Sequence, residues 1–259
     1  MAELSKQVVN LLNNSDVISS SLVAHKELLV DGLVDAFGEL EPRERLSRRE
    51  VEKFIHAAGA LLEHTAEQLR NSEQSYALEK GEDVEKRAER NQSSDLLRVA
   101  MQTVRDRMLG YGGEPLLKRY RIPLAMPRTT QKMQETAETI VKALNDKPET
   151  FTDLFGLQLS TQQMAKSLGG QLEKVKNARK DLGVEIRETQ AAMLTRDQHA
   201  EQFHKTYGGV GNIAAGCFEL LGEVGHAARL RPTVRRRRGE DKAPKSEEQT
   251  PTTPAAEKE

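Results

Sequence analysis

Two short patterns in the sequence place a carboxylate and an imidazole three residues apart. They are Glu201-x-x-His204 and Glu223-x-x-His226. In a helix this spacing brings both side chains to one face, where carboxylate oxygens and imidazole nitrogens can bind the same transition metal. These four residues are therefore the candidate ligands of a metal site.

A metal centre built from such pairs is typical of di-iron helical bundles, which combine a Glu-x-x-His pair from each of two helices with further glutamates. Two observations count against it. The chain is rich in glutamate, so the pattern arises easily by chance. The two pairs also follow one another closely, across Gly208 and Gly209, whereas the bundle needs a longer connection. We predict no metal and no cofactor, and keep the metal-binding bundle as the alternative.

The other residues with catalytic potential lack the surroundings that catalysis needs. Gly209-x-Gly211-x-x-Ala214 matches a dinucleotide-binding fingerprint in its letters, but that fingerprint follows a strand, and a helix is expected here. The single cysteine, Cys217, lies among small residues and is expected to be a buried thiol. One cysteine also excludes an intrachain disulfide. We expect a protein that is not an enzyme and has no catalytic residues.

Six arginines lie within ten residues near the C-terminal end of the sequence. On a flexible arm, such a cluster would bind the phosphates of a nucleic acid or an anionic membrane surface. No aromatic residues lie between the arginines, which argues against stacking on single-stranded bases. A solvated charged segment without a ligand is the alternative interpretation. The predicted polyanion-binding residues are Arg229, Arg231, Arg235, Arg236, Arg237 and Arg238.

The elements that must position these residues are predicted to be helices. Between Ser160 and Tyr207, apolar residues recur at alternating spacings of three and four, the heptad pattern of a helix that packs along another helix. Ser160 and Gln163 form a capping pair that would start this helix. Arg179 and Arg196 interrupt the apolar seam, where they would fix the register or contact a second chain.

A second long helix is predicted to begin at Ser47, which forms a capping pair with Glu50. Its heptad pattern weakens between Glu79 and Asp95, where either a solvated continuation or a break fits. The helix-forming Glu, Lys and Arg residues of this stretch favour continuation. We expect the helix to end at Gly110, because the glycines that follow can adopt positive φ angles.

Shorter helices are expected on either side of these two. One would be entered through Ser15 and end near Gly38. Another would be opened by Pro148 and continue through Phe155.

The fold class predicted from these elements is all-α: an elongated antiparallel helical bundle, similar to a coiled coil, with two long helices and shorter packing helices. The chain would divide into an N-terminal helical hairpin, a connector rich in proline and glycine, a C-terminal helical region whose last helix is rich in glycine and alanine, and a basic segment followed by a disordered tail. The boundaries of these four segments are 1–110, 111–128, 129–229 and 230–259.

The composition narrows the class of protein further. Hydrophobic residues make up 37% and charged residues 31% of the chain, and the formal net charge is −1. This balance suits helices with narrow apolar stripes and broad solvated faces. No signal peptide is recognisable, and no apolar run reaches the roughly 20 residues that a membrane-spanning helix requires. We therefore expect a cytoplasmic protein without a transmembrane segment.

The predicted function is that of a non-enzymatic helical scaffold or adaptor, which acts through protein–protein association and uses the arginine cluster as a second attachment point. The sequence does not identify the protein partner, and a homodimer fits it as well as a monomer. Besides the metal-binding bundle, the alternative is a membrane-interacting or pore-forming helical protein. That alternative rests on the small residues between Gly211 and Ala228, which allow close helix packing.

Overall fold

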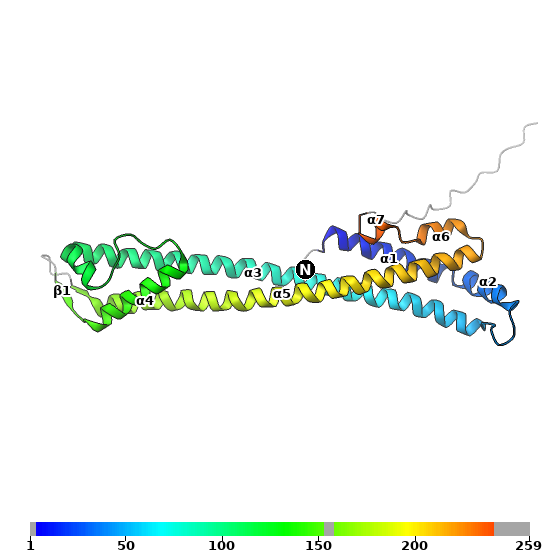
Figure 1. Cartoon of the computed structure of the whole chain (residues 1–259), viewed down its shortest axis with the longest axis horizontal. Helices are drawn as coiled ribbons and strands as arrows, with labels where there is room; N and C mark the ends of the chain where they lie inside the picture. Colours follow the sequence, from blue (N-terminus) through cyan, green and yellow to red (C-terminus); the bar gives the residue numbers. More distant parts are fainter. Residues whose placement is uncertain (1–3, 153–157, 241–259) are drawn as a thin grey trace, which may run out of the picture. The chain divides into compact units, whose positions relative to one another are not determined.

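The computed structural model describes residues 4–152 and 158–240, and most of these residues are helical (Figure 1). The prediction of an all-α fold, with two long helices packed against shorter ones, is confirmed. The long helices are α3, with 72 residues, and α5, with 60 residues. The elements in chain order are α1 (Lys6–Ala24), α2 (Lys26–Gly38), α3 (Arg48–Arg119), α4 (Thr130–Asp146), β1 (Thr150–Thr152), β2 (Gln158–Ser160), α5 (Thr161–Leu220), α6 (Val224–Leu230) and α7 (Val234–Arg237).

The chain forms two compact units, and each long helix contributes to both of them. Unit 1 comprises Met1–Ala77 and Ala192–Glu259, and unit 2 comprises Leu78–Ala191. The four segments expected from the sequence follow chain order, whereas unit 1 combines residues that are far apart in the sequence.

Unit 1 has a core made by α1, α2, α6 and parts of α3 and α5. Its aromatic centre is contributed by α5, where Phe203 and Tyr207 stack with their ring centroids 5.8 Å apart. Aliphatic side chains from the other helices surround this pair, so burial of apolar surface stabilises the unit. Buried members of this core include Leu11, Ile18, Leu29, Leu33, Ile55, Leu62, Leu69, Phe203, Tyr207, Phe218 and Leu230.

Unit 2 has a separate core between α4 and its own parts of α3 and α5. Within this unit α3 and α5 run antiparallel: the hydroxyl of Thr189 donates to the carbonyl of Glu79, while Glu185 lies beside Glu82. The apolar stripe of α4 packs onto both helices. Buried members of this core include Leu97, Met101, Met108, Leu117, Tyr120, Met133, Ile140, Leu168 and Val175.

The region between Glu79 and Asp95 is helical, so the predicted continuation of α3 is confirmed. Exposed ion pairs one turn apart support it, such as Arg87 with Asp83 at 3.0 Å. The helix does not end at Gly110. It continues until Gly113, whose φ of 65° interrupts the helical backbone before a last short turn that includes Pro115.

The prediction of a short helix starting at Pro148 is wrong at residues 150–152, which form strand β1. This strand pairs antiparallel with β2, with Phe151 opposite Leu159. Two β-branched threonines flank Phe151, a composition that suits a strand better than a helix. The remaining residues of the predicted helix, 153–155, lie outside the described residues.

Candidate functional site

The arginine-rich segment is folded against α1 in unit 1. Three amide side chains on α1 follow a spacing of three and four residues, so they lie on one face of the helix. Each donates a hydrogen bond to a backbone carbonyl of the segment: Gln7 to Arg238 (2.8 Å), Asn10 to Gly239 (2.9 Å) and Asn14 to Arg236 (3.4 Å). The expectation of a flexible basic arm is therefore wrong up to Glu240, and residues 241–259 lie outside the described residues. We call residues 229–240 the arginine clasp.

Apolar and glycine contacts complete the attachment of the arginine clasp. Leu230 and Pro232 are buried. A Cβ atom at Gly211 of α5 would lie only 2.4 Å from Cγ of Pro232, so this position requires glycine. Gly239 has a φ of 66°, and a Cβ there would lie 2.5 Å from the backbone oxygen of Gln7. The backbone path of the clasp is therefore fixed at both ends.

Two of the six predicted arginines hold the clasp together. Arg236 donates from Nη1 to the carbonyl oxygens of Arg229, at 2.7 Å, and Arg231, at 3.3 Å. Arg231 pairs with Glu219 of α5 at 2.5 Å. The side chain of Thr233 caps α7 by accepting from the backbone N–H of Arg236. These contacts link the turns of the clasp to each other and to α5.

The other four arginines have exposed side chains. Arg235 and Arg238 are each 69% exposed at the side chain, and each has Glu240 at 3.9 Å. The guanidinium of Arg237 lies above Gly208 of α5, about 3.5 Å from the place of its missing Cβ atom. Arg229 completes the set. The clasp therefore carries four arginines with exposed side chains on a fixed backbone.

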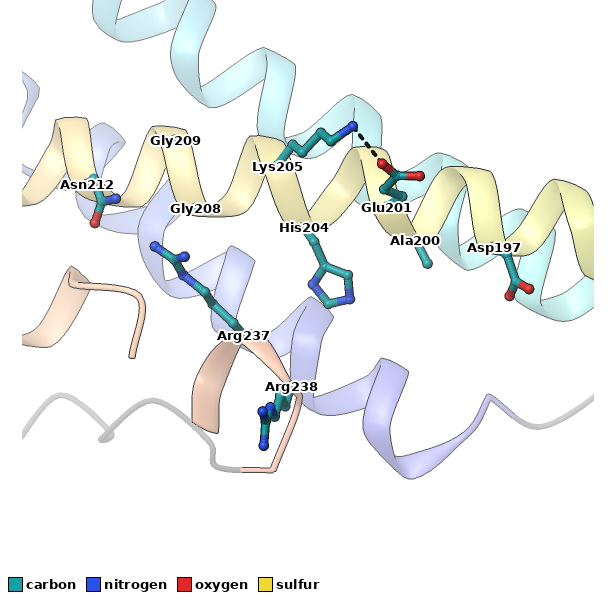
Figure 2. A pocket seen from close by; sticks show the side chains of 10 residues that line it. All are labelled: Asp197, Ala200, Glu201, His204, Lys205, Gly208, Gly209, Asn212, Arg237 and Arg238. Atoms are coloured by element: carbon teal, nitrogen blue, oxygen red, sulfur yellow. Dashed lines mark ion pairs between the residues drawn. The ribbon is translucent and has the colours of Figure 1, made fainter. Parts of the chain in front are cut away.

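An open groove of about 830 Å³ lies between α5 and the arginine clasp (Figure 2). Figure 2 shows His204 pointing from α5 toward the clasp, and Arg237 reaching from α7 toward Gly208. The residues that line the groove are Asp197, Ala200, Glu201, His204, Lys205, Gly208, Gly209, Asn212, Arg237 and Arg238.

The ionisable groups of the groove differ in charge at neutral pH. Burial lowers the pKa of His204, so its ring is neutral. The hydrogen bond from Lys205, at 2.7 Å, lowers the pKa of Glu201 and keeps its carboxylate ionised and paired. Arg237 and Arg238 add two guanidinium groups on the clasp side of the groove. The groove therefore has acidic groups, Asp197 and Glu201, on α5 and basic groups on the clasp.

The structure does not gather the four residues of the metal hypothesis into one set of ligands. Glu201 is paired with Lys205. The ring centroid of His226 lies 4.3 Å from that of His25, and the same ring stacks on Phe218. Glu223 precedes the first turn of α6. Among the described residues, the acidic, histidine and cysteine side chains that come together in a group of three are Glu79, Glu82 and Glu185.

The two remaining motifs occupy ordinary helical positions. Gly209, Gly211 and Ala214 all lie inside α5, without the preceding strand that a dinucleotide fingerprint needs. Cys217, also in α5, is partly buried beside the core of unit 1, and this burial raises the pKa of its thiol.

The sequence prediction identified the arginines of this site but missed the residues that hold them. Those residues are Gln7, Asn10, Asn14 and Gly239. One signal was present in the sequence: amide side chains at a spacing of three and four on one face of a helix. Amides on a helix usually face solvent, so the pattern alone does not predict a partner.

Comparisons with known proteins find no relative of this chain. No family model matches the chain, and no curated protein or solved structure is significantly similar to it. Within residues 4–152 and 158–240, no helix combines the length and the apolar character needed to cross a membrane.

Proposed function

We propose that this chain is a non-enzymatic helical scaffold that attaches to a phosphate-bearing polyanion through the arginine clasp. The observation that carries the proposal is the hydrogen bonding of Gln7, Asn10 and Asn14 to the backbone of the clasp. A guanidinium group on a fixed backbone loses less conformational entropy on binding than one on a free arm. Preorganisation of this kind turns a charged segment into a binding surface.

The chemistry of the exposed arginines suits phosphate. Guanidinium presents a planar fork of N–H donors that matches two phosphate oxygens, and it stays charged at any physiological pH. Arg235, Arg237 and Arg238 are consecutive or nearly so in one short helix and its end, so they can contact adjacent phosphates of one polymer or headgroup layer. Binding of this type is independent of base sequence and strongly dependent on salt.

The scaffold part of the proposal is supported by apolar side chains outside the core of unit 1. Phe54 and Leu61 of α3 are 49% and 50% exposed. They are seven residues apart, so they lie on one face of the helix, away from its buried seam. Exposed apolar residues at heptad spacing suit the docking of a partner helix.

The test compares two triple variants with the same change of charge. R235Q/R237Q/R238Q removes three arginines of the clasp without touching Arg231 or Arg236. R43Q/R49Q/R70Q removes three exposed arginines elsewhere in unit 1. Binding is measured by fluorescence anisotropy with a DNA duplex and by flotation with vesicles containing phosphatidylserine, each over a range of salt concentrations.

We expect the unmodified chain to bind at least one of the two polyanions, and the clasp variant to bind it at least about tenfold more weakly. On duplex DNA, the slope of log affinity against log salt should fall by about 0.9 for each phosphate that the clasp variant no longer neutralises. The control variant should keep its affinity. Equal affinities in the two variants, or no binding by the unmodified chain, would contradict the proposal. A comparison of binding to DNA with binding to vesicles shows whether the ligand is a nucleic acid or a membrane surface.

A further inference from the structure

Three carboxylates meet where α3 and α5 pack together in unit 2. Glu79 and Glu82 lie one turn apart on α3, and Glu185 faces them from α5. Their ligand oxygens all lie within 4.8 Å of one another. No lysine, arginine or histidine among the described residues forms an ion pair with any of the three.

Glu185 lacks the partners that a buried carboxylate requires. The residue is only 6% exposed, and its Oε1 atom is buried without a hydrogen-bond partner. An unpaired buried acceptor costs free energy, and an unpaired buried charge costs much more. A positive ligand at this oxygen would remove that cost.

The other charged groups around Glu185 increase the need for a counter-charge. On α3 these are Glu79, Glu82 and Asp83, and on α5 the nearby acid is Glu188. Burial, and then the charges of these acids, raise the pKa of Glu185. Lys86 on α3 interacts electrostatically with Glu185, but its ion pair is with Glu89, at 3.0 Å. Negative charge is thus in excess at this contact between two helices.

We propose that Glu79, Glu82 and Glu185 bind a hard divalent cation, of the type of Ca²⁺ or Mn²⁺, which links α3 to α5 within unit 2. The donors are all carboxylate oxygens, which suit these cations, whereas zinc and copper sites are usually completed by nitrogen or sulfur ligands. Glu82 is exposed, so water can supply the rest of the coordination sphere on that side. This site is separate from the arginine clasp and does not depend on the function proposed for it.

The experiment titrates Mn²⁺ or Ca²⁺ into the full chain after treatment with a chelator and its removal. Isothermal titration calorimetry gives stoichiometry and affinity, and electron paramagnetic resonance counts free Mn²⁺. The ligand variant is Glu185→Gln, which keeps the shape of the side chain and removes its charge. The control is Glu85→Gln, because Glu85 is exposed on α3 and lies outside the group.

We expect one saturable ion per unmodified chain and the same affinity in the control. Glu185→Gln should weaken binding by at least about tenfold, since even the loss of residues that only orient metal ligands has effects of this size. Circular dichroism checks that each variant is folded. If Glu185→Gln is not folded, Glu82→Gln replaces it, because the exposed Glu82 side chain contributes little packing.

Two results would overturn the proposal. One is the absence of saturable binding by the unmodified chain at millimolar ion concentrations. The other is an affinity that remains unchanged in the folded ligand variant.

Discussion

At the scale of single residues, the arginine clasp depends on small and amide side chains more than on the arginines themselves. Asn10 reaches the carbonyl of Gly239, while Gly239 leaves space for the backbone oxygen of Gln7. Any larger residue at this glycine meets backbone atoms, which cannot rotate away as a side-chain end can. The exposed arginines, in contrast, contribute charge and little packing.

Replacement of Gly239 by alanine tests this dependence. A φ of 66° is unfavourable for alanine, and the new Cβ would lie 2.5 Å from a backbone oxygen. We expect G239A to lower the free energy of unfolding of unit 1 by about 1–3 kcal/mol. Urea denaturation followed by circular dichroism measures the change.

The matched control for this substitution is Gly59→Ala in α3. A Cβ atom at Gly59 would have no neighbour within 4 Å. Alanine is the better helix former, so G59A should raise stability by about 0.5–1 kcal/mol. Equal effects of the two substitutions would show that the clasp is not held as described.

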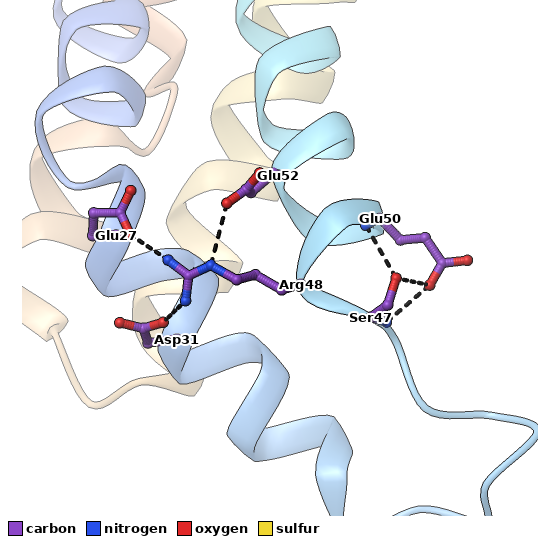
Figure 3. A network of polar contacts seen from close by, with 6 residues as sticks. All are labelled: Glu27, Asp31, Ser47, Arg48, Glu50 and Glu52. Carbon is purple, nitrogen blue, oxygen red and sulfur yellow. Dashed lines mark hydrogen bonds and ion pairs between the residues drawn. The ribbon is translucent and has the colours of Figure 1, made fainter.

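At the scale of elements, capping residues set where the long helix α3 begins. Figure 3 shows Ser47 and Glu50 bonded to each other: the backbone N–H of Ser47 donates to the Glu50 carboxylate at 2.8 Å, and its hydroxyl donates to the same oxygen at 2.6 Å. The next residue, Arg48, joins this start to α2 through Glu27 and Asp31. The helix start is therefore tied to a neighbouring element as well as capped.

Loss of the cap should be visible in stability and in its pH dependence. Ser47→Ala should destabilise the protein by about 0.5–2 kcal/mol. The hydrogen bonds from Ser47 lower the pKa of Glu50. Its ionised form therefore stabilises the folded state above the ordinary carboxyl pKa, and this contribution disappears as the pH falls through the lowered value.

Thermal melts of Glu50→Gln at several pH values check this sign. The difference in melting temperature from the unmodified chain should be largest near neutral pH and should shrink under acid conditions. Glu44→Gln, an exposed neighbour in the preceding turn, is the control. A difference that grows on acidification would contradict the assignment.

The sequence predicts elements well where the signal is local. The pair Ser47 and Glu50 follows from spacing alone, and the structure bears it out. The seams are borne out in most positions, such as Leu62, Leu168 and Phe203, but Met193 of α5 is 43% exposed. Strand β1 was missed because Pro148 favours a helix start equally well, and only pairing with β2 decides between the two. Helix α1 begins at Lys6 instead of near Ser15 because its first turns face the clasp, a contact far away in the sequence.

The candidate site was likewise predictable only in part. The positions of the arginines are read directly from the sequence. Their attachment is not, because Asn10 and Gly239 are 229 residues apart and a bond between an amide and a carbonyl leaves no periodic pattern. The cluster of Glu79, Glu82 and Glu185 was also not predictable, because it depends on how α3 and α5 are aligned along each other. The spacing of residues within each helix does not determine this alignment.

At the scale of the whole molecule, each unit has its own core, and the end of the chain matters for one of them. The sequence alone predicts that removal of residues 229–259 leaves stability nearly unchanged. The structure leads to the opposite prediction, because Leu230 and Pro232 are buried and three amides of α1 would be left without their partners. We expect this truncation to lower the melting temperature clearly.

A chain that ends at Glu240 is the control for this truncation, since it keeps every contact described for the clasp. It should melt at nearly the same temperature as the full chain, because residues 241–259 contain too little apolar sequence to add a core. Differential scanning calorimetry compares the three proteins. Identical melting of the full chain and the chain without residues 229–259 would show that the clasp adds no stability.

Unit 2 is one continuous stretch of chain, whereas unit 1 is assembled from two stretches on either side of it. During synthesis, the ribosome therefore delivers every residue of unit 2 before the second half of unit 1 has emerged. The helices α1 and α2 can pack on the first part of α3, but their core lacks the side chains of α5 and α6 until residues 192–230 have been synthesised. We expect nascent chains stalled before Ala192 to be protected from protease in residues 78–191 and open to it in α1 and α2.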